Sequence, residues 1–98
     1  DNSLLGKSIK KLETINQKIR NDDNLGKEKE IGHSFFYAID GKNDEAVVSV
    51  WLNEIFPLLE EYYYGESDAL ASLINNNIYQ EKRFTKDPEE VKGWIRGD

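Results

Sequence analysis

The amino-acid sequence predicts an all-α fold, a small bundle of four to five helices. Three observations indicate it. Apolar residues recur at three- and four-residue steps through most of the chain. Residues that start and stop helices stand between these segments. The length of 98 residues suits one modest core, so we expect a single helical domain over residues 1–98. Whether residues 79–98 belong to it or form a peripheral extension stays open.

A first helix is expected over about residues 4–21. Its apolar residues recur with helical spacing and place one stripe on one face: Leu5, Ile9, Leu12, Ile15 and Ile19. Residues 21–26 then end the helix, because Asn, Asp and Gly favour turns and the left-handed region. A polar connector, residues 27–30, follows.

A short second helix is expected to begin at His33 or Ser34 and to run to about Ile39, after Gly32 interrupts regular structure. Residues 40–43 form a turn, and Asp44 is a suitable N-cap for the next helix.

The third helix is expected to be the hydrophobic centre of the domain. Its apolar residues step by three and four: Val48, Trp51, Ile55, Leu58, Leu59 and Tyr62. Pro57 removes the backbone hydrogen bond to the carbonyl of Asn53, which predicts a bend. Two helices meeting at Pro57 are the alternative. Because the apolar stripe continues in phase, one helix kinked at Pro57 and ended by Gly65 is favoured.

Two further helices complete the prediction. Ser67 is expected to cap the first, with Leu70, Leu73 and Ile74 facing inward. Residues 79–85 are ambiguous and could be extended. Asp87 followed by Pro88 strongly indicates a helix start. The last helix then buries Val91, Trp94 and Ile95 and ends at Gly97.

Charge is unevenly distributed along a chain of net charge −6. No Lys or Arg lies between Lys42 and Lys82, whereas the N-terminal stretch is rich in lysine. An acidic middle disfavours nucleic acid as the main partner, since duplex binding depends on clustered basic residues. Solvated helix faces are the simplest explanation of both charge runs.

Several classes of protein are disfavoured by what the sequence lacks. It has no cysteine and no apolar run near the roughly 20 residues of a membrane span, so we expect a cytoplasmic protein that does not enter the membrane. It has no methionine, so we expect a piece of a longer protein. A single histidine, His33, and no phosphate loop predict no catalytic residue, no metal site and no cofactor in this chain.

Two groups of residues are the candidate functional positions. Gly32, His33 and Ser34 could present amide groups, an imidazole and a hydroxyl to an anion or a purine. The structural alternative is a turn that starts a helix. Of the three consecutive tyrosines at 62–64, at least one should be buried and one exposed, which suggests a protein-contact surface at Glu61, Tyr63 and Tyr64.

Three segments in this order resemble one known family. They are residues 12–19 (LETINQKI), residues 31–36 (IGHSFF) and residues 51–65 (WLNEIFPLLEEYYYG). Together they resemble the C-terminal helical lid of McrB-type AAA+ proteins, the NTPase subunits of modification-dependent restriction systems. The resemblance covers about residues 9–75.

The resemblance implies a lid that packs beside a nucleotide, GTP or ATP with Mg²⁺, held by an AAA+ core of the same protein. It further implies neighbouring ring subunits, a McrC-like nuclease subunit as partner, and contact with DNA only through other domains. Gly32, His33 and Ser34 are the residues that it places nearest the nucleotide. A free-standing acidic helical module that binds other proteins is the alternative.

Overall fold

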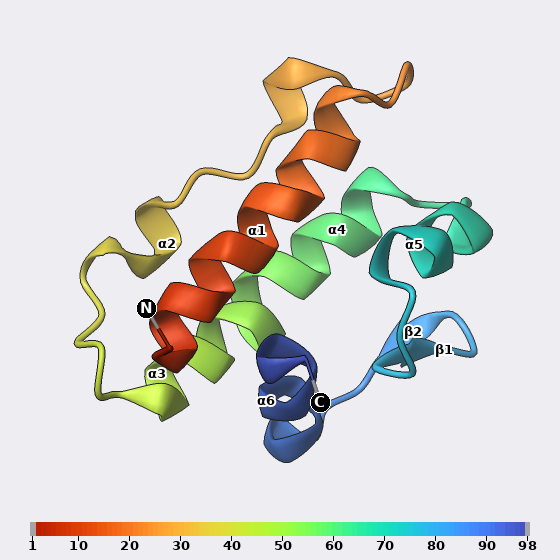
Figure 1. Ribbon diagram of the computed structural model, residues 1–98. Coiled ribbons are helices and arrows are strands. Elements are labelled where there is room, and N and C mark those ends of the chain that lie inside the picture. Colours follow the sequence, from red (N-terminus) through yellow and green to blue (C-terminus); the bar gives the residue numbers. More distant parts are fainter. Residues whose placement is uncertain (1, 98) are drawn as a thin grey trace.

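The computed structural model describes residues 2–97, and most of them are helical (Figure 1). The elements in chain order are α1 (Leu4–Arg20), a 3-10 turn (Lys27–Lys29), α2 (Ser34–Tyr37), α3 (Asp44–Val50), a π-helical segment (Trp51–Ile55), α4 (Phe56–Tyr62), α5 (Ser67–Ile74), β1 (Tyr79–Gln80), β2 (Arg83–Phe84) and α6 (Pro88–Arg96). If α3, the π segment and α4 are taken as one continuous helix, the described residues form five helices. The predicted all-α class is confirmed, with one small hairpin added.

Helix α1 is the long element against which α3, α5 and α6 pack. It begins where the Ser3 hydroxyl accepts a hydrogen bond from the amide of Gly6 at 3.0 Å. This bond satisfies one of the free amides of the first turn. The predicted stripe faces the core, with Leu12, Ile15 and Ile19 buried. The predicted helix over residues 4–21 is therefore confirmed to within one residue.

Two predicted caps are wrong by one residue. The N-cap of α3 is Asn43, whose side-chain oxygen accepts from the amide of Ala46 at 3.0 Å, and Asp44 is already helical. The N-cap of α5 is Glu66, and Ser67 is the first helical residue. A side chain caps a helix only from a residue whose own backbone is not yet helical, so neither Asp44 nor Ser67 can serve.

The predicted kink at Pro57 is not confirmed. Instead, the helix contains a π-helical segment directly before the proline, in which the amide of Phe56 donates to the carbonyl of Trp51 five residues earlier. The regular helix resumes as α4 at Phe56, so Pro57 lies in its first turn. An amide in the first turn has no partner within the helix, so the missing N–H of Pro57 is tolerated there.

The ambiguous stretch 79–85 forms an antiparallel hairpin, in which Tyr79 pairs with Phe84 and Gln80 with Arg83. Its two turn residues, Glu81 and Lys82, both have positive φ. Helix α6 follows, with the Asp87 carboxylate accepting from the amide of Glu89 at 2.9 Å, as the sequence predicts.

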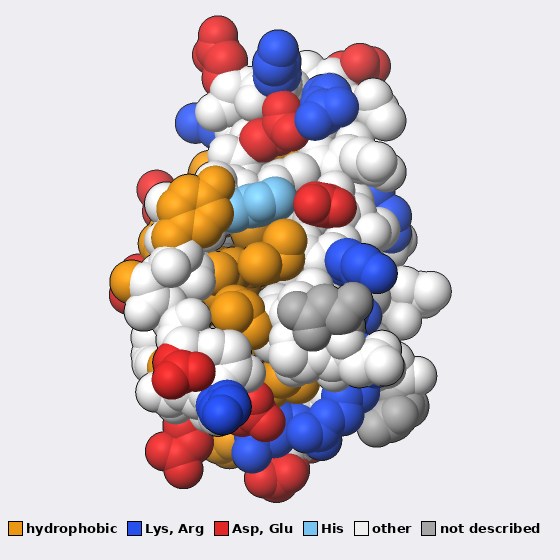
Figure 2. Space-filling view, turned by 60° about the vertical axis from the view of Figure 1, so that its left-hand side comes forward, with side chains coloured by type: hydrophobic (Ala, Val, Ile, Leu, Met, Phe, Trp, Pro, Cys, Tyr) orange, Lys and Arg blue, Asp and Glu red, His pale blue; other side chains and the backbone are white. Residues whose placement is uncertain are grey.

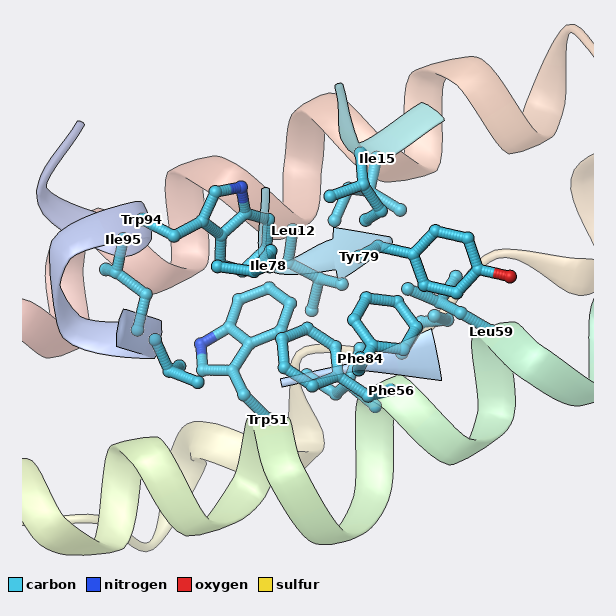
Figure 3. Packing of buried hydrophobic residues seen from close by; sticks show 14 of the residues in the cluster. Leu12, Ile15, Trp51, Phe56, Leu59, Ile78, Tyr79, Phe84, Trp94 and Ile95 are labelled. Carbon is cyan, nitrogen blue, oxygen red and sulfur yellow. The ribbon is translucent and has the colours of Figure 1, made fainter. Parts of the chain in front are cut away.

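The hairpin and α6 supply side chains to the central core (Figure 3). Trp51 is fully buried, and the indole of Trp94 meets it edge-on with ring centroids 5.0 Å apart. The ring of Phe84 stacks on Phe56 at a centroid distance of 4.0 Å. Residues 79–97 therefore contribute side chains to the same core as the rest of the chain.

Candidate functional site

The Gly32-His33-Ser34 turn follows Ile31, whose backbone is clamped to α1 by two hydrogen bonds with the side chain of Asn16. The Asn16 side chain accepts from the amide of Ile31 and donates to the carbonyl of the same residue, both at 2.7 Å. Both residues are buried. Asn16 thus satisfies two buried backbone groups that no helix or strand would satisfy, and it sets the position of the chain just before the turn.

An ion pair lies next to this clamp. The guanidinium of Arg20, one helical turn beyond Asn16, donates to the carboxylate of Glu30 at 2.6 Å. This hydrogen bond lowers the pKa of the Glu30 carboxyl, with the positive charge of Arg20 adding to the effect. Glu30, the last residue of the connector, and Ile31, which follows it, are therefore both bonded to side chains of α1.

The other side of the turn is anchored by Phe36. Its ring is 1% exposed and lies against Trp51, with ring centroids 5.9 Å apart. Residues 32–35 therefore run between two buried points, Ile31 and Phe36.

Between these anchors, the three predicted residues remain accessible. Gly32 and Ser34 are exposed and His33 is half-buried. His33 is the N-terminal flanking residue of α2, a helix of four residues, but its side chain makes no capping hydrogen bond. Figure 2 shows the imidazole, the one pale-blue side chain, beside a hydrophobic patch on this face of the molecule. The turn thus presents an imidazole and a hydroxyl to whatever lies outside.

Gly32 is not required by packing within the chain. It is absent from the glycines with positive φ among the described residues. A Cβ placed on it would meet the Ser34 hydroxyl oxygen at 3.7 Å, an ordinary van der Waals distance. The chain therefore has room for a side chain at this position.

The second predicted group, at the end of α4, is divided by the structure. Tyr64 is 88% exposed and Glu61 is also exposed, whereas Tyr63 is only 6% exposed and belongs to the core. The expectation of one buried and one exposed tyrosine is confirmed. A contact surface here can use Glu61 and Tyr64 but not the ring of Tyr63.

Asn16 and Ser8 are residues that the sequence reasoning missed. The buried hydroxyl of Ser8 accepts from the indole nitrogen of Trp51 at 2.9 Å. Both residues lie on the side of α1 that faces the core. Polar residues on an otherwise apolar helix face were the available signal.

Within residues 2–97, no three His, Asp or Glu side chains are arranged to hold a metal ion. Over the same residues, no helix has both the length and the apolar character that a bilayer crossing needs.

Comparison of the sequence with models of known protein families identifies the chain as an α-helical lid domain. Residues 7–71 match the model described as McrB, alpha-helical lid domain. The match covers about two thirds of the chain, and the chain belongs to this McrB lid family. Searches of curated proteins and of solved structures find no match.

Proposed function

We propose that this chain is the lid of a McrB-like AAA+ NTPase and that Gly32, His33 and Ser34 face a nucleotide held by the core of the same protein. The observation that carries the proposal is the turn itself. An exposed glycine, an imidazole and a hydroxyl stand between two buried anchors, Ile31 and Phe36. Membership of the McrB lid family supports the rest.

The chemistry of the turn suits a purine nucleotide. The hydrophobic patch beside His33 offers a surface for a base, and the imidazole and hydroxyl can hydrogen-bond to its edge, to the sugar or to a phosphate (Figure 2). Gly32 has no packing role within the chain, so its missing side chain leaves space for a close approach from outside. GTP or ATP with Mg²⁺ is the proposed ligand.

The chain alone has no catalytic role in this proposal. Hydrolysis belongs to the core, and the lid moves as one body when nucleotide is bound or released, because both ends of the turn are tied to the hydrophobic core. That movement would couple hydrolysis to a ring of neighbouring subunits and to a McrC-like nuclease, with DNA contacted through other domains.

The test is steady-state hydrolysis of GTP and of ATP by the full-length protein with single substitutions in the turn. Gly32→Leu fills the space that the proposal assigns to the nucleotide, and His33→Ala and Ser34→Ala each remove a polar contact. We expect His33→Ala and Ser34→Ala each to raise KM by roughly 2- to 13-fold, equivalent to about 0.5–1.5 kcal/mol per hydrogen bond, and Gly32→Leu to raise KM by steric exclusion. Lys42→Ala, on an exposed side chain outside the turn, is the matched control.

Unchanged KM and kcat in both Gly32→Leu and His33→Ala would overturn the proposal. A second measurement uses this chain alone. Titration with GTP or ATP should produce only weak NMR shifts, confined to residues 31–36. Tight binding by the isolated chain would contradict the assignment of the main nucleotide contacts to the core.

A contact role for the end of α4 is the second candidate function. Tyr64 is a large side chain left almost entirely exposed beside Glu61, and exposed tyrosines are typical of protein interfaces. Tyr64→Ala in the full-length protein should weaken assembly with neighbouring subunits or with the nuclease partner and leave KM for nucleotide unchanged. Unaltered assembly, measured by analytical ultracentrifugation with and without the nuclease partner, would remove this candidate.

A further inference from the structure

A groove of about 520 Å³ lies between α1, the end of α5 and α6. Five of its lining residues are cationic: Lys7, Lys10, Lys11, Lys18 and Arg96. Among residues 2–97, no Asp or Glu lines it, although the whole chain has a net charge of −6. The groove therefore concentrates positive charge on a molecule that is otherwise acidic.

Apolar side chains lie among these cations. They come from all three helices: Ile15, Leu73, Ile74, Trp94 and Ile95. The groove is therefore both basic and partly hydrophobic.

Two of the lysines are held in place by the fold. The ammonium of Lys11 lies 4.4 Å from the centre of the Trp94 ring, and burial lowers the pKa of Lys11. The ammonium of Lys18 donates to the carbonyl of Leu73 at 3.3 Å, at the end of α5. These two side chains are already ordered. A ligand that binds them would therefore cost less side-chain conformational entropy than a ligand that binds mobile surface lysines.

The lysines of the groove are not paired with carboxylates of the residues that the structure describes. Among residues 2–97, none of its four lysines forms an ion pair. Arg96 lies 4.0 Å from the Asp44 carboxylate, and the two side chains are 46% and 40% exposed. An exposed pair at this distance contributes little stability, so Arg96 remains available to another anion.

The groove and the Gly32-His33-Ser34 turn lie on opposite sides of α1. Lys7 and Asn16 are nine residues apart, which at 3.6 residues per turn is two and a half turns. Figure 1 shows the segment with α2 on one side of α1, and α5 and α6 on the other. The groove can therefore be occupied while the turn faces another ligand.

We propose that the groove between α1, α5 and α6 docks an acidic peptide segment of a partner protein. Carboxylates of the segment pair with the lysines and Arg96, while interspersed apolar side chains contact the apolar lining. Charge complementarity carries the choice of partner, since the described part of the chain lines the site with five cations and no carboxylate.

Single-stranded nucleic acid is the less suitable ligand for this groove. Such ligands bind through bases stacked on aromatic rings, as well as through charge. Among the described lining residues, the one aromatic ring is that of Trp94, which is 5% exposed and lies beneath Lys11, so no base can stack on it. The same residues include one guanidinium, that of Arg96, which limits bidentate phosphate contacts.

The test is NMR titration of this chain with a synthetic peptide of repeated Glu-Glu-Leu units. We expect shifts at the amides of residues 7–18, 73–75 and 94–96, and an affinity that falls several-fold when salt is raised from about 50 to 300 mM. The same peptide with Gln in place of Glu should bind at least fivefold more weakly.

A matched pair of double variants distinguishes binding at this groove from an effect of the chain's net charge. Lys7→Glu with Lys10→Glu should lower the affinity about tenfold, since two attractive contacts become repulsive. Lys27→Glu with Lys42→Glu makes the same change on exposed side chains outside the groove and should leave affinity within about twofold. Amide spectra of both variants establish that they are folded.

Each of four outcomes would overturn the proposal. These are no binding of the Glu-Leu peptide, equal binding of the Gln peptide, equal loss in the two double variants, and tighter binding of a thymidine oligonucleotide than of the peptide at the same groove residues.

Discussion

At the scale of single residues, two buried polar side chains of α1 connect it to distant parts of the chain. Ser8 accepts from the indole nitrogen of Trp51, and Asn16 bonds both backbone groups of Ile31. Such bonds add modest net stability, but their loss leaves buried donors or acceptors unpaired, which is more costly. They therefore specify which segments lie beside α1.

We expect Asn16→Ala to lower the free energy of unfolding by about 2–4 kcal/mol, because the amide and carbonyl of Ile31 both lose their partner. Urea unfolding measures this change, and amide exchange should become faster at residues 31–34. Gln17→Ala, on the exposed side of the same helix, should change stability by no more than about 0.5 kcal/mol. Equal effects of the two substitutions would show that the clamp does not contribute.

At the scale of elements, the π-helical segment explains how a proline fits within the central helix. Buried positions continue through it, with Val47 and Val48 before the segment, Trp51 and Ile55 within it, and Phe56, Leu59 and Tyr63 after it. The predicted Leu58 and Tyr62 are only half-buried, and Pro57 is accommodated at an exposed position of the following first turn.

We expect Pro57→Ala to change the free energy of unfolding by less than about 1 kcal/mol, since the proline lies in the first turn of α4, where it is well tolerated. Urea unfolding and far-ultraviolet circular dichroism measure the result for this chain. A loss of more than about 1 kcal/mol would contradict the placement of Pro57 in a tolerant first turn.

The hairpin and α6 lie beyond the residues that the family model matches, yet they complete the core. We expect Phe84→Ala to destabilise the chain by about 3–5 kcal/mol, because it removes a buried ring stacked on Phe56. Urea unfolding measures it, with the exposed Arg83→Ala as control. A chain that still unfolds in one transition with unchanged midpoint would show that the hairpin is not part of the cooperative unit.

At the scale of the whole molecule, burial of tyrosines links stability to alkaline pH. Burial raises the pKa of Tyr63 and of Tyr79, and nearby carboxylates raise it further. The folded chain therefore holds these phenol protons more tightly than the unfolded chain does. Stability from this source is complete below the unfolded pKa of about 10 and is lost as pH rises through the folded pKa values.

We expect the free energy of unfolding to fall as pH rises above the unfolded tyrosine pKa of about 10, and to fall less steeply in the Tyr63→Phe, Tyr79→Phe double variant. Urea unfolding at a series of pH values measures the slope. Tyr37→Phe, on a side chain that is 77% exposed, is the matched control. If the free energy of unfolding falls with pH as steeply in the double variant as in the wild type, burial of Tyr63 and Tyr79 is not the cause.

The helices were predictable from sequence because their signals are local. The stripe through Leu12 and Ile15 defines α1, and Asp87 with Pro88 defines the start of α6. The π segment was not predictable, since the buried residues around it keep helical spacing.

Features that depend on distant partners could not be predicted either. The strands have two residues each, too few for an alternating pattern to appear. At the candidate site, residues 32–34 could be proposed from their types, but the partner of Asn16 lies 15 residues away in the chain.

The carboxamide of Asn16 offers Ile31 one N–H donor and one carbonyl acceptor, the same pair as a peptide group. It therefore acts on Ile31 as a single rung of a β-ladder would, with a helix in place of the neighbouring strand. A slip of one residue along α1 would break both bonds. Any motion that carries His33 toward or away from a ligand should thus carry α1 with it, with the turn at one fixed height on the helix.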